Sequence, residues 1–198
     1  GLCATSGLGI ASVASRLEPI AKVLDAARRH VRLVLHLVTS STPGSMGRGS
    51  PVVRRAGNRA WVATKGGTHG EHVAALCGSD AWGGKIIDRL QPRPGEPEVI
   101  ARRWSAFADT SLDLLLRSNG ISEVVLLGFT TSGMIETAAR EGAARDFNMW
   151  ILEDCVADFD SNADLHADSL KFLARGLTSV TSSREMLGHA QRQVPVGA

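Results

Sequence analysis

The stretch of residues 121–140 constrains the fold more than any other part of the chain. Residues 124–127 form a short, unbroken apolar run, which is typical of a strand buried on both faces of a parallel sheet. A small polar turn follows Gly128, and a helix-favouring segment then covers residues 135–145. This order places a residue at the carboxyl end of a strand and the amino end of a helix, where open α/β folds build their sites.

The residue at that position is Met134. A thioether is a weak acceptor without an acidic proton, so it cannot serve as the nucleophile of an acyl transfer. The sequence therefore predicts the framework of an active site without its reactive atom.

Helical and strand patterns alternate along the rest of the chain, which predicts a parallel, doubly wound sheet. We expect one domain, residues 1–198, with the three-layer α/β/α architecture of Rossmann-like folds and a loop-like lead-in over residues 1–15. His36 is interpreted as a core histidine that bonds to a neighbour. The expected helices are 17–30, 112–117, 135–145, 165–175 and one capped by Ser183, and the expected strands are 31–38, 99–101, 124–127, 149–152 and 179–181.

Residues 39–81 form a loop-rich insertion, with one possible hairpin around Gly57. A connection of this length in a compact α/β domain usually covers a site or forms an interface. His69 and His72 lie three residues apart beside glycine, and no third ligand is evident, so we predict no metal site.

The overall composition limits the classes of partner. A formal net charge of +2 is too small to indicate binding to nucleic acid or to an anionic membrane. No apolar run approaches the length of a membrane span, and there is no signal-peptide pattern. The three cysteines are widely spaced, which argues against a disulfide framework, and we expect a cytoplasmic setting.

From Trp82 to about residue 186 the chain resembles the isochorismatase-like cysteine hydrolases. This family includes isochorismatases, nicotinamidases, and N-carbamoylsarcosine, ureidoacrylate and maleamate amidohydrolases, and the turn resembles most the branch that acts on carbamoyl and maleamate-type amides. The resemblance implies an α/β hydrolase of carbon–nitrogen bonds that needs no cofactor. The segments that carry it are WGG at 82–84, LQP at 90–92, RWSAF at 103–107, GFTTSG at 128–133, ETAAR at 136–140, ED at 153–154 and His166.

The resemblance also implies a triad of a cysteine nucleophile, a supporting lysine and an aspartate base. The cysteine position corresponds to Met134 and the lysine position to Ala101. Arg102 is adjacent, but a strand neighbour points to the opposite face, so it is a poor substitute. The aspartate belongs to a central first strand that should precede residue 1. We expect that an upstream segment or another segment fills this place, because two half-sheets would otherwise expose their edges.

Three functions are compatible with this pattern. The first is a non-catalytic structural or regulatory subunit of a homo-oligomer, or of a hetero-oligomer with an active family member. The second is an active hydrolase with relocated chemistry, for which Ser132, Thr131, Ser105 and His69 or His72 are conceivable participants.

The third is a pseudoenzyme that binds a small amide or carboxylate. In this hypothesis Arg103, Trp104 and Phe107 line the pocket, although each could also be an ordinary packing or ion-pair residue. Cys155 is interpreted as a buried structural thiol. The turn that would receive the ligand consists of Phe129, Thr130, Thr131, Ser132, Gly133 and Met134.

Overall fold

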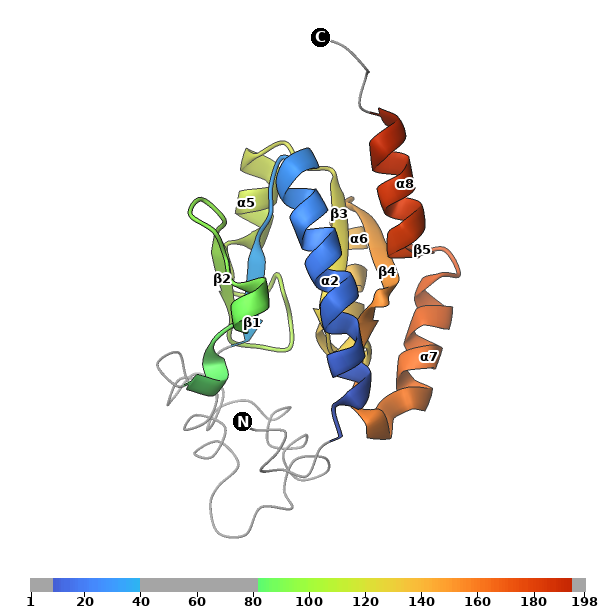
Figure 1. Ribbon diagram of the computed structural model, residues 1–198. Helices are drawn as coiled ribbons and strands as arrows, with labels where there is room; N and C mark the ends of the chain where they lie inside the picture. The colour runs from blue at the N-terminus through green and yellow to red at the C-terminus, as the bar shows by residue number, and fades with distance from the viewer. Residues whose placement is uncertain (1–8, 40–81, 194–198) are drawn as a thin grey trace.

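The structure, a computed structural model, describes residues 9–39 and 82–193 (Figure 1). Helical and strand segments alternate through both ranges, as the sequence predicts. In chain order they are α2 (Ala11–His30), β1 (His36–Thr39), η1 (Trp82–Gly84), η2 (Asp88–Leu90), β2 (Glu98–Ala101), α5 (Leu112–Ser118), β3 (Glu123–Phe129), η3 (Thr131–Ile135), α6 (Glu136–Ala143), β4 (Asn148–Ala157), η4 (Asp160–Asn162), α7 (Ala163–Leu173), β5 (Ser179–Thr181) and α8 (Ser183–Gln193).

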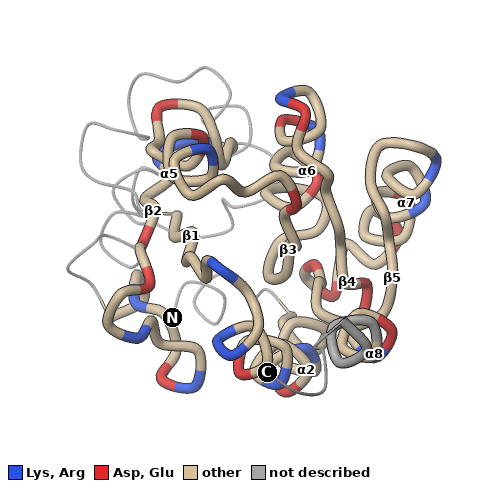
Figure 2. The backbone as a smooth tube through the Cα atoms, turned by 90° about the horizontal axis from the view of Figure 1, so that it is seen from above, with Lys and Arg blue, Asp and Glu red and all other residues tan. Residues whose placement is uncertain are grey.

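All described strand pairs are parallel, and helices cover both faces of the strands, so the fold is the predicted three-layer α/β/α architecture. One sheet has the order β1-β2 and the other has the order β3-β4-β5. Seen from above, the strands follow one another as β2, β1, β3, β4 and β5 (Figure 2). The carboxyl ends of all five strands therefore point to the same edge of the molecule.

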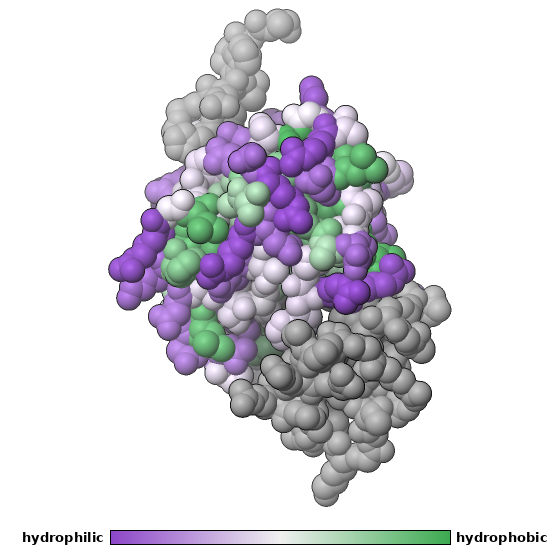
Figure 3. All heavy atoms as spheres, turned by 180° about the vertical axis from the view of Figure 1, so that it is seen from behind, coloured by the Kyte–Doolittle hydropathy of each residue, from purple (hydrophilic) through white to green (hydrophobic). Residues whose placement is uncertain are grey.

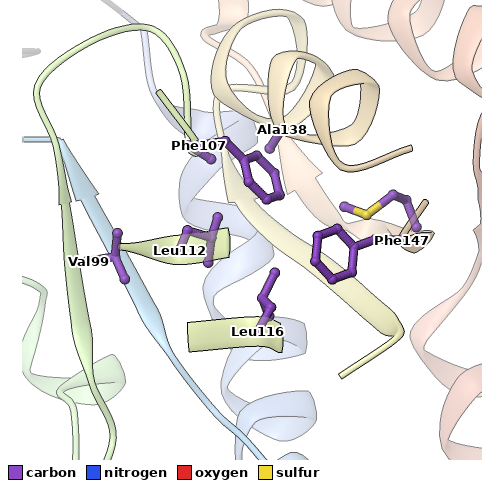
Figure 4. Packing of buried hydrophobic residues seen from close by; sticks show 8 residues of the cluster. Val99, Phe107, Leu112, Leu116, Ala138 and Phe147 are labelled. Atoms are coloured by element: carbon purple, nitrogen blue, oxygen red, sulfur yellow. The ribbon is translucent and has the colours of Figure 1, made fainter. Parts of the chain in front are cut away.

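One layer of helices packs on a core that both sheets share. Phe107 and Phe147 stack with ring centroids 6.0 Å apart, and the side chains around them come from β2, α5, α6 and β4 (Figure 4). Half-buried leucines beside β1 and on β3 complete this cluster. Its buried members are Val99, Ala106, Phe107, Leu112, Leu116, Ala138, Phe147 and Met149.

The other layer consists of α2 and α8. Ile20 and Val23 of α2 pack on Leu152 and Cys155 of β4, with residues of α8 at the rim. On the first face, α6 and α7 pack on Ile151 of β4. Neighbouring residues of β4 thus face opposite layers, which explains the uninterrupted apolar run at residues 149–152.

The predicted burial of residues 124–127 on both faces is not observed. These side chains are half-buried, and Val125 is 41% exposed. The physical reason is that, among the described residues, β3 pairs only with β4. Its other edge is directed toward β1 (Figure 2) but forms no hydrogen-bonded ladder with that strand.

Several element boundaries differ from the predictions. Helix α2 begins at Ala11 rather than at residue 17, so Pro19 lies inside the helix. The cause is a distant carboxylate: Asp160 accepts hydrogen bonds from the backbone N–H groups of Ala11 and Ser12, and this stabilises an early start. Strand β1 covers His36–Thr39, whereas a strand over residues 31–38 was expected.

The terminal helix is capped by Ser182, which exchanges hydrogen bonds with Glu185 in a capping box, rather than by Ser183.

The insertion predicted at residues 39–81, including Gly57, His69 and His72, lies outside the described residues after Thr39. Within the two described ranges, no helix combines the length and apolar character needed to cross a bilayer. On the face seen from behind, hydrophobic residues occur as separate spots among polar ones (Figure 3).

Candidate functional site

The candidate site is the turn that joins β3 to α6 at the carboxyl edge of the strands. The backbone enters it through Gly128, whose φ of +118° is unfavourable for residues with a Cβ atom, and the Phe129–Thr130 peptide bond is cis. The Thr130 carbonyl then accepts hydrogen bonds from the N–H groups of Gly133 and Ile135. A Cβ atom at Gly133 would lie 2.5 Å from Thr130 Oγ1, so a glycine fits this close approach best.

A buried carboxylate holds this turn in place. Asp158, at the end of β4, accepts hydrogen bonds from both the N–H group and the hydroxyl of Ser132, at 2.9 and 2.6 Å. Its other oxygen accepts hydrogen bonds from the Phe159 N–H group and the Asn162 amide. With four donors and 3% exposure, the carboxylate is fully used as a structural acceptor.

A histidine contacts the same turn from α7. His166 Nδ1 lies 2.8 Å from Thr131 Oγ1, and Thr131 is completely buried. Burial lowers the pKa of His166 below its ordinary value, and the positive charge of Arg16 lowers it further, while Asp158 acts in the opposite direction. The lowered pKa favours the neutral form of the imidazole, which hydrogen-bonds with the threonine hydroxyl.

Met134 lies in η3, one residue before its end, and is half-buried. Ala101 is the last residue of β2 and is completely buried. Neither side chain can ionise. Arg102, next to Ala101, is exposed, in agreement with the expectation that it points away from the buried face.

The three residues predicted to line the pocket lie between β2 and α5 in different surroundings. Arg103 forms an exposed ion pair with Asp109 at 2.6 Å, and Trp104 is about half exposed. Phe107 is buried against Phe147, with the Arg145 guanidinium 4.8 Å from its ring centroid. These contacts explain Arg103 and Phe107 as ion-pair and packing residues. That the three residues line a ligand pocket stays a prediction.

Cys155 is buried in β4, as the sequence analysis predicted. Burial raises the pKa of its thiol to about 12, and the nearby Asp154 carboxylate adds to this effect. The thiol therefore stays protonated at neutral pH and cannot act as the alternative nucleophile.

His36 confirms its predicted role as a core histidine with a bonded neighbour. Its Nε2 lies 2.8 Å from Glu96, which also receives two hydrogen bonds from the Arg28 guanidinium. The bond from Arg28 holds the pKa of Glu96 down at about 2. This network joins α2 to β1 and to the turn before β2.

The roles of Asp158, Asp160 and Glu96 were not predicted from the sequence. A usable signal existed for Asp158, because it directly follows the apolar run of β4 at the edge where parallel strands end. Among the described residues, no group of three or more His, Cys, Asp or Glu side chains is arranged to hold a metal ion.

Comparison with known proteins gives one consistent result. The model of the isochorismatase domain matches residues 1–185. A ureidoacrylate amidohydrolase, RutB, of Rhizobium rhizogenes is 28% identical over 154 residues, which are 76% of this chain and 61% of the relative. A secreted isochorismatase effector, Isc1, of Verticillium dahliae is 37% identical over 76 residues, which are 38% of this chain and 40% of that protein.

Solved structures agree on the fold. A cysteine hydrolase from Pseudomonas syringae superposes with a TM-score of 0.74 at 22% identity, covering 92% of this chain and 83% of that structure. N-carbamoylsarcosine amidase from Thermoplasma acidophilum gives a TM-score of 0.68 at 23% identity, covering 87% and 84%. The chain spans less than two thirds of the length of the two curated relatives named above.

Proposed function

Because the chain belongs to the isochorismatase family, we propose that it is a non-catalytic member, a structural or regulatory subunit of a homo-oligomeric or hetero-oligomeric amidohydrolase. The observation that carries this proposal is Met134, an inert thioether at the start of the helix that the site turn leads into. Another residue could take over the role of the nucleophile only if its side chain were nucleophilic and had a base and a cation nearby.

The surroundings of the turn support the same conclusion. Ala101 offers no cation at the end of β2, and the nearby Arg103 is neutralised by Asp109. The Ser132 hydroxyl donates to a carboxylate that already has three other donors. A hydroxyl held in this way caps the turn and is not poised to attack a substrate.

A relocated hydrolase is the second candidate, because Thr131 and His166 form the hydroxyl–imidazole pair that activates a nucleophile in other enzymes. The complete burial of Thr131 disfavours it, since a nucleophile must reach its substrate. A pseudoenzyme that binds a small amide or carboxylate at the turn is the third candidate.

Activity measurements separate the first two candidates. Purified protein is incubated with ureidoacrylate, N-carbamoylsarcosine and simple amides, and release of ammonia is followed. We expect no turnover above the buffer rate. Turnover that is lost in Thr131→Val or His166→Asn, but not in the surface variant Asp168→Asn, would overturn the proposal in favour of relocated catalysis.

Assembly and ligand binding test the remaining part. The chain is mixed with a catalytically active family member, and co-elution and the rate of the active partner are measured together with the native mass of the chain alone. A stable oligomer of either kind is expected. A strictly monomeric chain that neither co-elutes nor changes the rate contradicts the subunit role. Calorimetry with small carboxylates then tests the third candidate.

A further inference from the structure

An arginine at the carboxyl edge of the strands has no partner within the described part of the chain. Arg16 belongs to α2, one helical turn before Ile20 and two before Val23, which pack on Cys155 and its neighbours in β4. Residues with this spacing share one face of a helix, so Arg16 is on the face that packs on the sheet. Its positive charge lowers the pKa of His166 in α7 and opposes the burial that raises the pKa of Cys155.

The starts of α2 and α7 lie next to each other at this edge (Figure 1). The backbone N–H groups of the first two residues of α2 bind Asp160, which lies in η4 directly before α7. Side chains of α2 are tilted toward this edge, because Cα–Cβ bonds point to the N-terminus of a helix. His166 lies in the first turn of α7 and contacts the site turn through Thr131. Arg16 therefore lies at the same edge as the site turn.

The hydrogen-bonding capacity of Arg16 is not used. Its Nε–H group is buried, and the described residues offer it no acceptor. Nor does Arg16 form an ion pair with a described carboxylate.

The acidic groups of this edge are occupied by other donors. Asp154 accepts two hydrogen bonds from Ser183, at 2.7 and 2.5 Å. Asp158 has four donors, and Asp160 caps α2. A buried donor without an acceptor costs free energy, and a ligand that supplies the acceptor removes this cost.

The surroundings of Arg16 select the chemical class of the missing acceptor. A guanidinium presents its donors in a planar fork, which a carboxylate matches with two parallel hydrogen bonds. The starts of α2, α6 and α7 all lie at this edge, and the N-termini of helices favour negative charge. The Asp158 and Asp160 carboxylates oppose a second negative charge, so a monovalent carboxylate fits better than a phosphate dianion.

We propose that Arg16 binds the carboxylate group of a small ligand at the carboxyl end of β4, between the starts of α2 and α7. The Nε–H group and one terminal N–H group of the guanidinium donate to the two carboxylate oxygens. The bound ligand neutralises the charge that acts on His166. The inference goes beyond the proposed subunit role, because assembly requires no ligand, and either one can fail without the other.

NMR titration of the His166 imidazole in the purified chain tests this proposal, with the resonance assigned from His166→Asn. Acetate is the probe, acetamide is its neutral counterpart, and sodium chloride keeps the ionic strength constant. Because the charge of Arg16 lowers the pKa of His166, acetate bound to Arg16 should raise that pKa in a saturable way. Half-saturation on the order of a few mM is expected for so small a ligand. A pKa that is the same in acetate, acetamide and chloride would overturn the proposal.

Substitutions on α2 separate specific binding from general effects of salt. In Arg16→Gln we expect the response to acetate to be lost. In Arg16→Lys, which keeps the charge but not the planar fork, acetate should bind about tenfold more weakly. Arg29→Gln is the matched control, because Arg29 is exposed on the same helix, and it should respond as the unaltered protein does. A response that survives in Arg16→Gln, or that is reduced equally in Arg29→Gln, indicates an adventitious ion only and contradicts the site.

Chemical modification of the unaltered protein gives a test that does not depend on the folding of a variant. Phenylglyoxal modifies accessible guanidinium groups, and the modified peptides are mapped by mass spectrometry. At ten times its half-saturating concentration, acetate should slow the modification of Arg16 about tenfold, because only the unoccupied site reacts. Arg29 should be unaffected, and acetamide should protect neither residue. If Arg16 does not react in buffer, or reacts equally fast with and without acetate, the site does not exist.

Discussion

The Ser132 hydroxyl lies 2.6 Å from the Asp158 carboxylate, and this bond joins the turn after β3 to the end of β4. The same carboxylate oxygen accepts the Ser132 N–H group. Two residues that are 26 positions apart in sequence, each just beyond the end of a strand, are thus joined by one side chain. Asp158 therefore holds the conformation of the turn whether or not chemistry takes place there.

Replacement of Asp158 should destabilise the protein through this turn. In Asp158→Asn one half of the carboxylate becomes an NH₂ group that faces N–H donors, and we expect a loss of about 2 kcal/mol in the free energy of unfolding. Urea denaturation measures the loss. Asp168→Asn on the exposed side of α7 is the control and should change stability by less than ~0.5 kcal/mol. Equal effects of the two substitutions would contradict the structural role of Asp158.

The Glu96 network should make stability depend on pH in acid. Because the pKa of Glu96 is about 2 in the folded protein, below its ordinary 4.5, its contribution is present above pH 4.5 and is lost as pH falls toward 2. Glu96→Gln should cost on the order of 3 kcal/mol at pH 7, because the buried Arg28 guanidinium loses its bidentate carboxylate and retains only the Gln91 carbonyl and, at 3.7 Å, Asp25. The cost should shrink at lower pH.

Glu98→Gln on the exposed side of β2 is the matched control for this substitution. Thermal unfolding of both variants at several pH values tests the prediction. A Glu96→Gln protein with the stability and pH profile of the Glu98→Gln protein would show that the network contributes nothing.

The Cys155 thiol should be unreactive in the folded protein. Its pKa of about 12 leaves almost no thiolate at pH 8, so alkylation in a Cys3→Ser, Cys77→Ser background should follow global unfolding. The unfolded chain releases this proton near pH 9, whereas the folded protein retains it until about pH 12. The stability should therefore fall as pH rises through this window.

Cys155→Ala removes this titration and should have a shallower decline in stability between pH 9 and 10.5. The comparison uses the slopes, since the substitution also removes packing. Rapid labelling at a rate that denaturant does not change would refute the prediction.

An alanine at Gly142 should destabilise α6, although alanine is the better helix former by about 1 kcal/mol. Its Cβ atom would lie 2.4 Å from the sulfur of Met149 and 2.7 Å from its terminal methyl group, and Met149 is buried in the shared core. We expect a net loss of about 1–3 kcal/mol. In a Met149→Val background the same substitution should cost less, and calorimetric unfolding of the four proteins measures this coupling.

The sequence predicts the local elements of this fold better than their boundaries. The alternation of apolar strands with helical stripes is enough for the layer architecture, and β5 has the predicted bounds. The early start of α2 could not be predicted, because Asp160, which caps it, is 149 residues away. The exposure of Val125 could not be predicted either, since an apolar run does not show how each edge of its strand is paired.

The location of the candidate site could be predicted from the sequence, but the hydrogen bonds between its side chains could not. Gly128 and the polar turn after it mark the carboxyl edge from sequence alone, and Met134 is identified there as inert. The contact between Thr131 and His166 requires α7 to fold back over the turn, which no local pattern indicates. The comparisons establish the family, and the loss of catalysis stays a proposal.

Helix α2 bridges the two sheets through contacts at both of its ends. The backbone N–H groups of its first turn donate hydrogen bonds to Asp160, beyond the end of β4. Arg28 in its last turn donates hydrogen bonds to Glu96, just before β2. A single helix about 30 Å long therefore connects the two halves of the domain. The two ends of α2 are accordingly held by two carboxylates that come from different halves of the domain.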